Sequence, residues 1–160
     1  MKVFLTGATG LVGAHTGLAL LEAGHQLRLL VRDQGLAQAW FAERGHQIDD
    51  CCVADMRDRE AVAKGIAGCD AVVHAAAVVN LDTRQGKETM AANLAGVDSV
   101  ITAAVRMGLQ KILYVSSVAI FMHPQAKSLR EDGSLAVVGE SYSGAKIACE
   151  QKVRALQTEG

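Results

Sequence analysis

A glycine-rich segment near the start of the chain limits the possible folds more than any other feature of the sequence. Residues 6–13 read TGATGLVG, which places three glycines at the spacing G-x-x-G-x-x-G. The apolar run Lys2–Thr6 comes directly before these glycines and reads as a strand, and Leu11–Ala23 overlaps their end and reads as a helix. A strand, a glycine-rich turn and a helix in this order are typical of the first unit of an α/β nucleotide-binding domain.

Each of the three glycines has a physical use in such a turn. Gly7 permits the tight turn, Gly10 permits a pyrophosphate to approach the backbone, and Gly13 permits the helix to pack close to the sheet. The first N–H groups of the helix also favour an anion. A glycine-rich loop without a ligand is the alternative, but the strand before the turn and the helix after it favour binding. The residues that we expect around the diphosphate are Gly7, Thr9, Gly10, Leu11, Val12 and Gly13.

Short apolar runs and helical stretches alternate along the rest of the chain. The further expected strands are Leu27–Val31, Gln47–Val53, Ala71–His74 and Lys111–Ser116, and the further expected helices are Leu36–Arg44, Arg57–Lys64, Lys87–Met107 and Ser141–Gln157, with an irregular segment over 118–140. This alternation predicts an α/β fold, a Rossmann-type doubly wound parallel sheet with helices on both faces. We expect residues 1–160 to form one NAD(P)-binding domain.

Composition excludes several classes of protein. Half of the residues are hydrophobic, so a disordered chain is excluded, and the net charge of −1 gives no basic field for nucleic acid or an anionic membrane surface. The four cysteines lack the C-x-x-C spacing, so we expect no metal site and a reducing compartment. No signal-peptide pattern precedes the first strand, and we expect a cytoplasmic protein.

Two adjacent charged residues make opposite predictions about the cofactor. Asp33 lies about 20 residues after the last glycine, where an acidic residue binds the ribose hydroxyl of NAD. Arg32 ends the second expected strand, where a guanidinium pairs with the 2′-phosphate of NADP. We favour Arg32 and NADP, and NAD stays open as the alternative.

A serine pair and a tyrosine–lysine pair carry the possible chemistry. Tyr142 and Lys146 are spaced Y-x-x-x-K, so on a helix they share one face, where the ammonium would stabilise a phenolate. A tyrosine in this setting acts as a general acid or base near neutral pH. Ser116 and Ser117 end the fifth expected strand, at the carboxyl edge of the sheet, where a hydroxyl would hydrogen-bond a reacting oxygen.

Several short motifs share a pattern with one known family. They are TGATGLVG at residues 6–13, Asp55-Met56, His74-Ala75-Ala76-Ala77, Asn93 in AANLAGV, Tyr114-Val115-Ser116-Ser117-Val118, Leu129-Arg130-Glu131-Asp132 and the Tyr142/Lys146 pair. Together they make nearly the whole chain resemble the extended short-chain dehydrogenase/reductases of the NAD-dependent epimerase/dehydratase superfamily. The ending Val31-Arg32-Asp33 looks most like the NADP-using, dihydroflavonol-4-reductase-like branch.

The resemblance implies a role for each matching residue. Tyr142 would be the general acid/base, Lys146 would lower its pKa and hold the nicotinamide ribose, and Ser117, better spaced than Ser116, would position the substrate oxygen. Further residues that it implies at the cofactor are Asp55 and Met56 at the adenine, Ala75, Ala76 and Ala77 beside the cofactor, and Asn93 on the long helix. Ala145 replaces a serine often found before the lysine, which is a mild departure.

The resemblance also implies an activity that needs more chain than is present. Extended members continue with a substrate-binding domain, so we expect a truncated chain with little or no turnover by itself. The leading function is an NAD(P)-dependent oxidoreductase that moves hydride between nicotinamide and a carbonyl or alcohol. The alternatives are a nucleotide-sugar epimerase or dehydratase with tightly bound NAD, and a non-catalytic NAD(P) sensor that binds protein partners. The long helices are possible homodimer faces.

Overall fold

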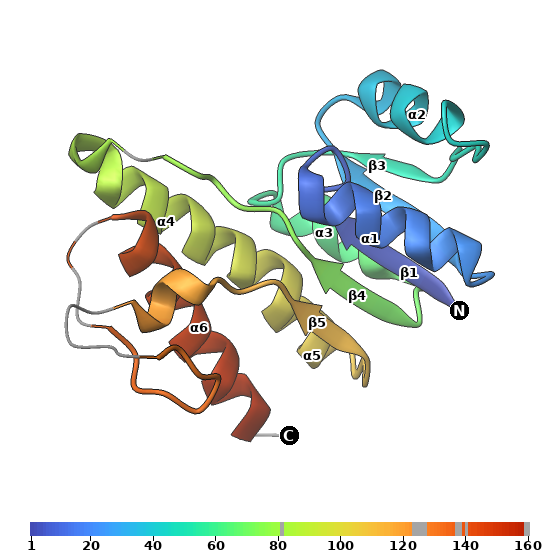
Figure 1. Cartoon of the computed structure of the whole chain (residues 1–160). Coiled ribbons are helices and arrows are strands. Elements are labelled where there is room, and N and C mark those ends of the chain that lie inside the picture. Colours follow the sequence, from blue (N-terminus) through green and yellow to red (C-terminus); the bar gives the residue numbers. More distant parts are fainter. Residues whose placement is uncertain (81, 123–127, 137–138, 140, 159–160) are drawn as a thin grey trace. The chain divides into compact units, whose positions relative to one another are not determined.

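The computed structural model describes residues 1–80, 82–122, 128–136, 139 and 141–158 (Figure 1). Two compact units divide the chain. The first contains Met1–Ala77 and Asp98–Val115, and the second contains Val78–Val97 and Ser116–Gly160. Among the described residues, no helix is both long enough and apolar enough to cross a membrane.

The first unit is a five-stranded parallel sheet with helices on both faces. In chain order its strands are β1 (Lys2–Thr6), β2 (Gln26–Val31), β3 (Cys51–Val53), β4 (Ala71–His74) and β5 (Ile112–Tyr114). Its helices are α1 (Leu11–Glu22), α2 (Gln34–Ala42), α3 (Arg59–Ile66) and α5 (Ala103–Arg106). The strand order is β3-β2-β1-β4-β5 and all the pairings are parallel. The doubly wound Rossmann-type sheet predicted from the sequence is confirmed.

Alternate side chains of the central strand face opposite layers of the unit. Leu5 on β1 belongs to the buried cluster that includes Phe41 of α2, and both side chains approach Gly17 of α1. The neighbouring Phe4 points to the other face, where its ring approaches Gly65 of α3. Figure 1 shows α1 in front of this sheet and α3 behind it. Because the strands are buried on both faces, they are apolar almost throughout.

Aspartates determine where two of the helices begin. The Asp33 carboxylate accepts a hydrogen bond of 3.0 Å from the Leu36 N–H, and α2 therefore starts at Gln34, two residues before the predicted start. The Asp58 carboxylate accepts one of 3.0 Å from the Ala61 N–H in the same way. This cap places the start of α3 two residues later than predicted.

The third strand is shorter than predicted, because β3 begins at Cys51 and not at Gln47. The residues before it are held by side chains instead of a strand ladder. The Gln38 amide donates to the Ile48 carbonyl at 2.8 Å, and the Asp50 carboxylate pairs with Arg28 at 2.7 Å. These contacts fix the segment without regular pairing.

The second unit contains α4 (Gly86–Val97), α6 (Tyr142–Thr158) and two 3-10 turns, Thr83–Gln85 and Val118–Phe121. Helices α4 and α6 pack together, and Ile147 of α6 joins a small core with Ile120 and Ala136. A π-helical turn, Asp98–Thr102, and α5 follow α4, so the predicted long helix contains a change of helical type. Within the predicted irregular segment, positions 123–127, 137, 138 and 140 lie outside the described residues.

We expect Gly17→Ala to destabilise the fold. Its new Cβ would lie 2.9 Å from side-chain carbons of both Leu5 and Phe41, and overpacking of a core typically costs about 1–3 kcal/mol. Urea denaturation measures the change. The matched control is Gly35→Ala in α2, where the nearest contact of the new Cβ is 3.5 Å and helix propensity favours alanine. Equal stability of the two variants would contradict the packing argument.

Candidate functional site

The glycine turn packs directly against the end of β4. Gly7 has a φ of +76°, and a Cβ at this position would lie 2.7 Å from the Ala75 carbonyl carbon and the Ala76 nitrogen. A Cβ on Gly13 would overlap the Gly7 carbonyl oxygen. Gly10 differs, because the nearest atom to its Cβ position would be the Gly7 oxygen at 3.4 Å. Gly7 and Gly13 thus serve the close packing of the turn, and Gly10 faces open space.

The first N–H groups of α1 are not capped by a side chain. Gly10 is its N-cap residue, no side chain caps the helix, and its first turn contains no acidic residue. The side chains of Leu11 and Val12 in this turn are 79% and 52% exposed. The first N–H groups of α1 are therefore left to a ligand or to solvent, whereas those of α2 and α3 are capped by Asp33 and Asp58.

Thr6 holds the chain that follows β4 beside the glycine turn. The Ala76 N–H donates to the buried Thr6 hydroxyl at 3.1 Å, and this hydroxyl also lies 2.7 Å from His74 Nδ1. His74 is buried and belongs to this network. Thr6 is not among the predicted site residues, although its position directly before the first glycine was a possible signal.

Charged residues gather at the carboxyl ends of β2 and β3. Arg32 is exposed there, and its charge is one of those that lower the pKa of Asp55. Asp33 is committed to capping α2. The largest cause of the lowered Asp55 pKa is its hydrogen bond with Arg57, whose Nε lies 2.7 Å from Oδ1. The carbonyl of Met56 accepts a hydrogen bond from the hydroxyl of Ser99.

Asn93 of α4 uses its amide to hold backbone. Its Oδ1 accepts from the Val78 N–H at 2.8 Å, and its Nδ2 donates to the Val78 and Thr89 carbonyls at 2.9 and 3.0 Å. The side chain therefore fixes the start of the loop after Ala77. A direct contact of Asn93 with a cofactor stays a prediction.

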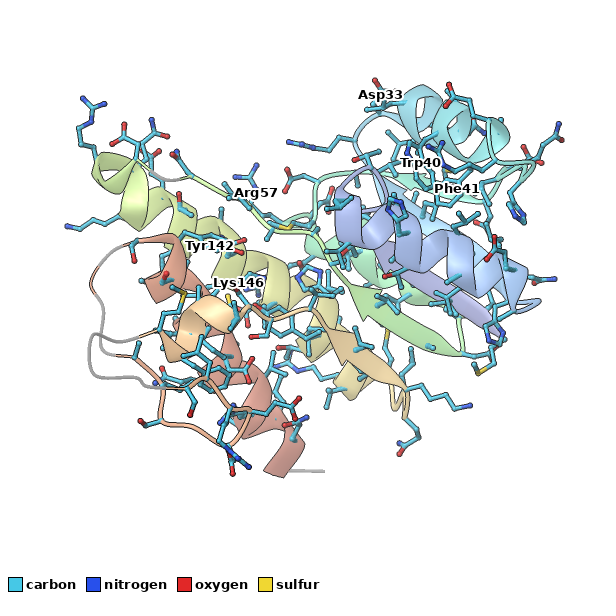
Figure 2. The ribbon with its side chains drawn as sticks, in the orientation of Figure 1. Asp33, Trp40, Phe41, Arg57, Tyr142 and Lys146 are labelled. Atoms are coloured by element: carbon cyan, nitrogen blue, oxygen red, sulfur yellow. The ribbon has the colours of Figure 1, made fainter. Side chains whose placement is uncertain are left out.

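The tyrosine and the lysine lie one turn apart on α6 (Figure 2). Ser141 fixes the start of this helix, because its hydroxyl accepts from the Gly144 N–H at 3.1 Å and its carbonyl accepts from the Ala145 N–H at 2.9 Å. Tyr142 is half-buried, and Lys146 is only 4% exposed. Burial lowers the pKa of Lys146, and the negative charges available at Cys149 and Glu150 partly oppose this effect.

The two serines after β5 have different surroundings. The Ser117 hydroxyl accepts from the Ala119 N–H at 3.2 Å and so begins the 3-10 turn Val118–Phe121, against which α6 packs. The Ser116 hydroxyl is buried and has no hydrogen-bond partner in the described part of the chain. Both serines line a pocket of about 900 Å³ in the second unit, together with Ile120, Phe121, Arg130, Glu150 and Arg154.

The predicted site residues fall into two groups. The first unit holds the glycine turn, Ala75–Ala77, Arg32, Asp55 and Met56. The second unit holds Asn93, Ser117, Tyr142 and Lys146. The predicted roles of these residues at a cofactor or substrate stay predictions.

Comparisons with known proteins identify the family of this chain. The sequence model of the NAD dependent epimerase/dehydratase family matches residues 3–160. A putative dihydroflavonol 4-reductase of Synechocystis sp. is 32% identical over 139 residues, which are 87% of this chain and 37% of the relative. Sterol demethylase protein B of Methylococcus capsulatus is 30% identical over 132 residues, which are 80% of this chain and 38% of the relative. The chain thus spans well under half the length of these curated relatives.

A solved structure shows the same fold. The UDP-glucose 4-epimerase of Bifidobacterium longum, in complex with NAD+ and UDP, matches with a TM-score of 0.88 at 20% identity, covering 99% of this chain and 50% of that one. The family match spans nearly the whole sequence, as the resemblance to extended short-chain dehydrogenase/reductases predicted. The chain therefore belongs to the NAD dependent epimerase/dehydratase family.

Proposed function

We propose that this chain binds NADP(H) in preference to NAD(H) and carries the Ser117, Tyr142 and Lys146 of a reductase that acts on a carbonyl or alcohol. The observation that carries the proposal is the open N-terminus of α1, which has neither a side-chain cap nor an acidic first turn. Gly10 leaves space in front of this helix end, so the residues present fit a diphosphate.

The preference for NADP(H) rests on Arg32 and Asp33. Asp33 uses one carboxylate oxygen, Oδ1, to cap α2, which ties this carboxylate to the start of the helix. Arg32 is exposed at the end of β2 and matches the geometry of a phosphate with its planar guanidinium. The exposed guanidinium of Arg32 therefore favours a cofactor that carries a 2′-phosphate, which is NADP(H).

The proposed chemistry assigns one task to each residue of the second unit. When bound, the nicotinamide supplies or accepts the hydride. Ser117 keeps its hydroxyl proton free to donate to the substrate oxygen, since the Ala119 N–H uses only an acceptor position. Tyr142 gives a proton to that oxygen during reduction, or takes one during oxidation. The Lys146 ammonium, held in a buried position, stabilises the resulting phenolate.

A second candidate is a nucleotide-sugar epimerase or dehydratase with tightly held NAD. It is favoured by the structural likeness to an epimerase that binds NAD+ and UDP. The two candidates differ in the form of the cofactor: near-stoichiometric NAD in the purified chain supports this one, and exchangeable NADPH supports the reductase.

We expect the chain to bind NADPH more tightly than NADH. A hydrogen-bonded ion pair with Arg32 is worth about 1.5 kcal/mol or more, so the preference should be about tenfold. Arg32→Gln should remove it and leave NADH affinity nearly unchanged. Fluorescence titration of both dinucleotides measures the preference. Tighter binding of NADH by the unchanged chain would overturn the assignment of Arg32.

We expect Gly10→Val to weaken both dinucleotides by at least about tenfold, because its side chain would occupy the space before the α1 N–H groups. Gly10 has an extended backbone, φ −93° and ψ 163°, which valine adopts without strain. Valine is a poorer N-cap residue than glycine, so we expect a modest fall in the melting temperature of a variant that still folds. Undiminished binding would show that the diphosphate lies elsewhere.

We expect stability to depend on pH through Lys146. Its pKa in the folded state lies below the ordinary value of 10.5, so between the two values the unfolded chain binds more protons. The buried ammonium therefore lowers the free energy of unfolding at low pH, and this cost disappears as the pH rises toward 10.5. Lys146→Met lacks the titrating group and serves as the reference. Urea denaturation of both chains should show that the stability of the unchanged chain relative to Lys146→Met rises with pH, and a falling difference would contradict the burial of a charged lysine.

A further inference from the structure

The turn that follows β3 is fixed by its own hydrogen bonds. The Asp58 N–H donates to the Asp55 carbonyl at 3.0 Å, and the Arg57 N–H donates to Asp55 Oδ1 at 2.9 Å. Asp58 then caps α3. The buried Ser99 hydroxyl holds the Met56 carbonyl from the π-helical turn. The backbone of Asp55 and Met56 thus has little freedom.

The side chain of Asp55 is held as firmly as its backbone. Arg57 binds the carboxylate through two donors of its guanidinium, a bidentate fork, with Nε 2.7 Å from Oδ1 and Nη2 3.0 Å from Oδ2. Together with the Arg57 N–H, two donors reach Oδ1, and one donor from the described residues reaches Oδ2. Oδ2 therefore keeps an acceptor position for a further donor.

Exposure and charge make this position usable by a ligand. The Asp55 side chain is 35% exposed, so its carboxylate is reachable from solvent. The hydrogen bonds from Arg57 lower the pKa of Asp55, and the nearby charge of Arg32 adds to this effect. The carboxylate is therefore ionised at neutral pH and accepts hydrogen bonds without donating any.

We propose that Arg57 is a positioning residue for adenine recognition: its guanidinium fork fixes the Asp55 carboxylate so that Oδ2 faces the exocyclic amine of the base. The inference rests on the proposed dinucleotide binding at this edge of the sheet, with the adenine at Asp55 as the family resemblance implies. A fork with two parallel N–H donors fixes both the position and the plane of a carboxylate, whereas a lysine supplies a single charged point. Without the fork, Asp55 would be free to rotate away from the base.

Replacement of the adenine by hypoxanthine tests the inference. Hypoxanthine carries an oxygen where adenine carries the amine, so a fixed carboxylate would meet an acceptor instead of a donor. We expect the unchanged chain to bind NADPH about tenfold or more tightly than the hypoxanthine analogue of NADPH. Arg57→Gln should bring this ratio to within about threefold of unity. Arg57→Lys, which keeps the charge but not the fork, should also lower it.

Two further variants and one control make the outcome specific. Asp55→Asn should lose the discrimination as Arg57→Gln does, because both act on the same hydrogen bond. Arg59→Gln is the matched control, since Arg59 lies two residues after Arg57 and is also exposed. Its ion pair with Asp98 is long, at 3.8 Å. Arg59→Gln should leave the ratio unchanged. Titration calorimetry gives the affinities, and melting temperatures report whether each variant folds.

The outcomes separate this inference from the proposed function. If Arg57→Gln keeps the discrimination while Asp55→Asn loses it, Arg57 does not position the carboxylate and the inference is overturned. If Arg57→Gln instead lowers the preference for NADPH over NADH at constant base discrimination, its charge acts on the 2′-phosphate and the inference is equally overturned. If the unchanged chain binds neither adenine dinucleotide, the proposed function fails, and the inference fails with it.

Discussion

The approach of the glycine turn to the backbone after β4 is the constraint on which the proposed dinucleotide site depends. Gly7 lies so close to Ala75 and Ala76 that no side chain fits between them, and Gly13 lies so close to Gly7 that the same holds there. Thr6 ties the same two segments together through the Ala76 N–H. This packing places the uncapped N-terminus of α1 at the carboxyl edge of the sheet, where ligands of α/β folds bind.

The helices that follow β1, β2 and β3 differ in whether a side chain caps their first N–H groups. Asp33 and Asp58 cap α2 and α3, and each satisfies an N–H group that would otherwise need a partner. Gly10 offers α1 no such side chain. Unlike the starts of α2 and α3, the positive end of α1 is therefore open to an external anion.

The sequence was sufficient for the order of strands and helices, because apolar runs and glycines report directly on burial and turns. It was insufficient where side chains determine local geometry. The third strand was predicted too long because Ile48 is apolar, although a side-chain hydrogen bond from Gln38 holds its carbonyl. No periodicity reveals the π-helical turn at Asp98–Thr102. The bond from Ser99 to Met56 is equally hidden, since it joins residues far apart in sequence.

The same limit applies to the candidate site. The spacing of Asp55 and Arg57 is visible in the sequence, but the bidentate geometry is not, and Asp33 could not be recognised as a cap until α2 was seen to begin at Gln34.

Lys146 shows this limit most clearly. A tyrosine and a lysine four residues apart are common on exposed helices, where both side chains are solvated and neither is perturbed. Here the lysine lies at 4% exposure between Ala145 and Ile147, which are also buried, and an apolar residue would fill this position without the cost of desolvating an ammonium. Packing alone therefore does not explain a lysine at this position, whereas the proposed proton transfer at the tyrosine one turn away would explain it.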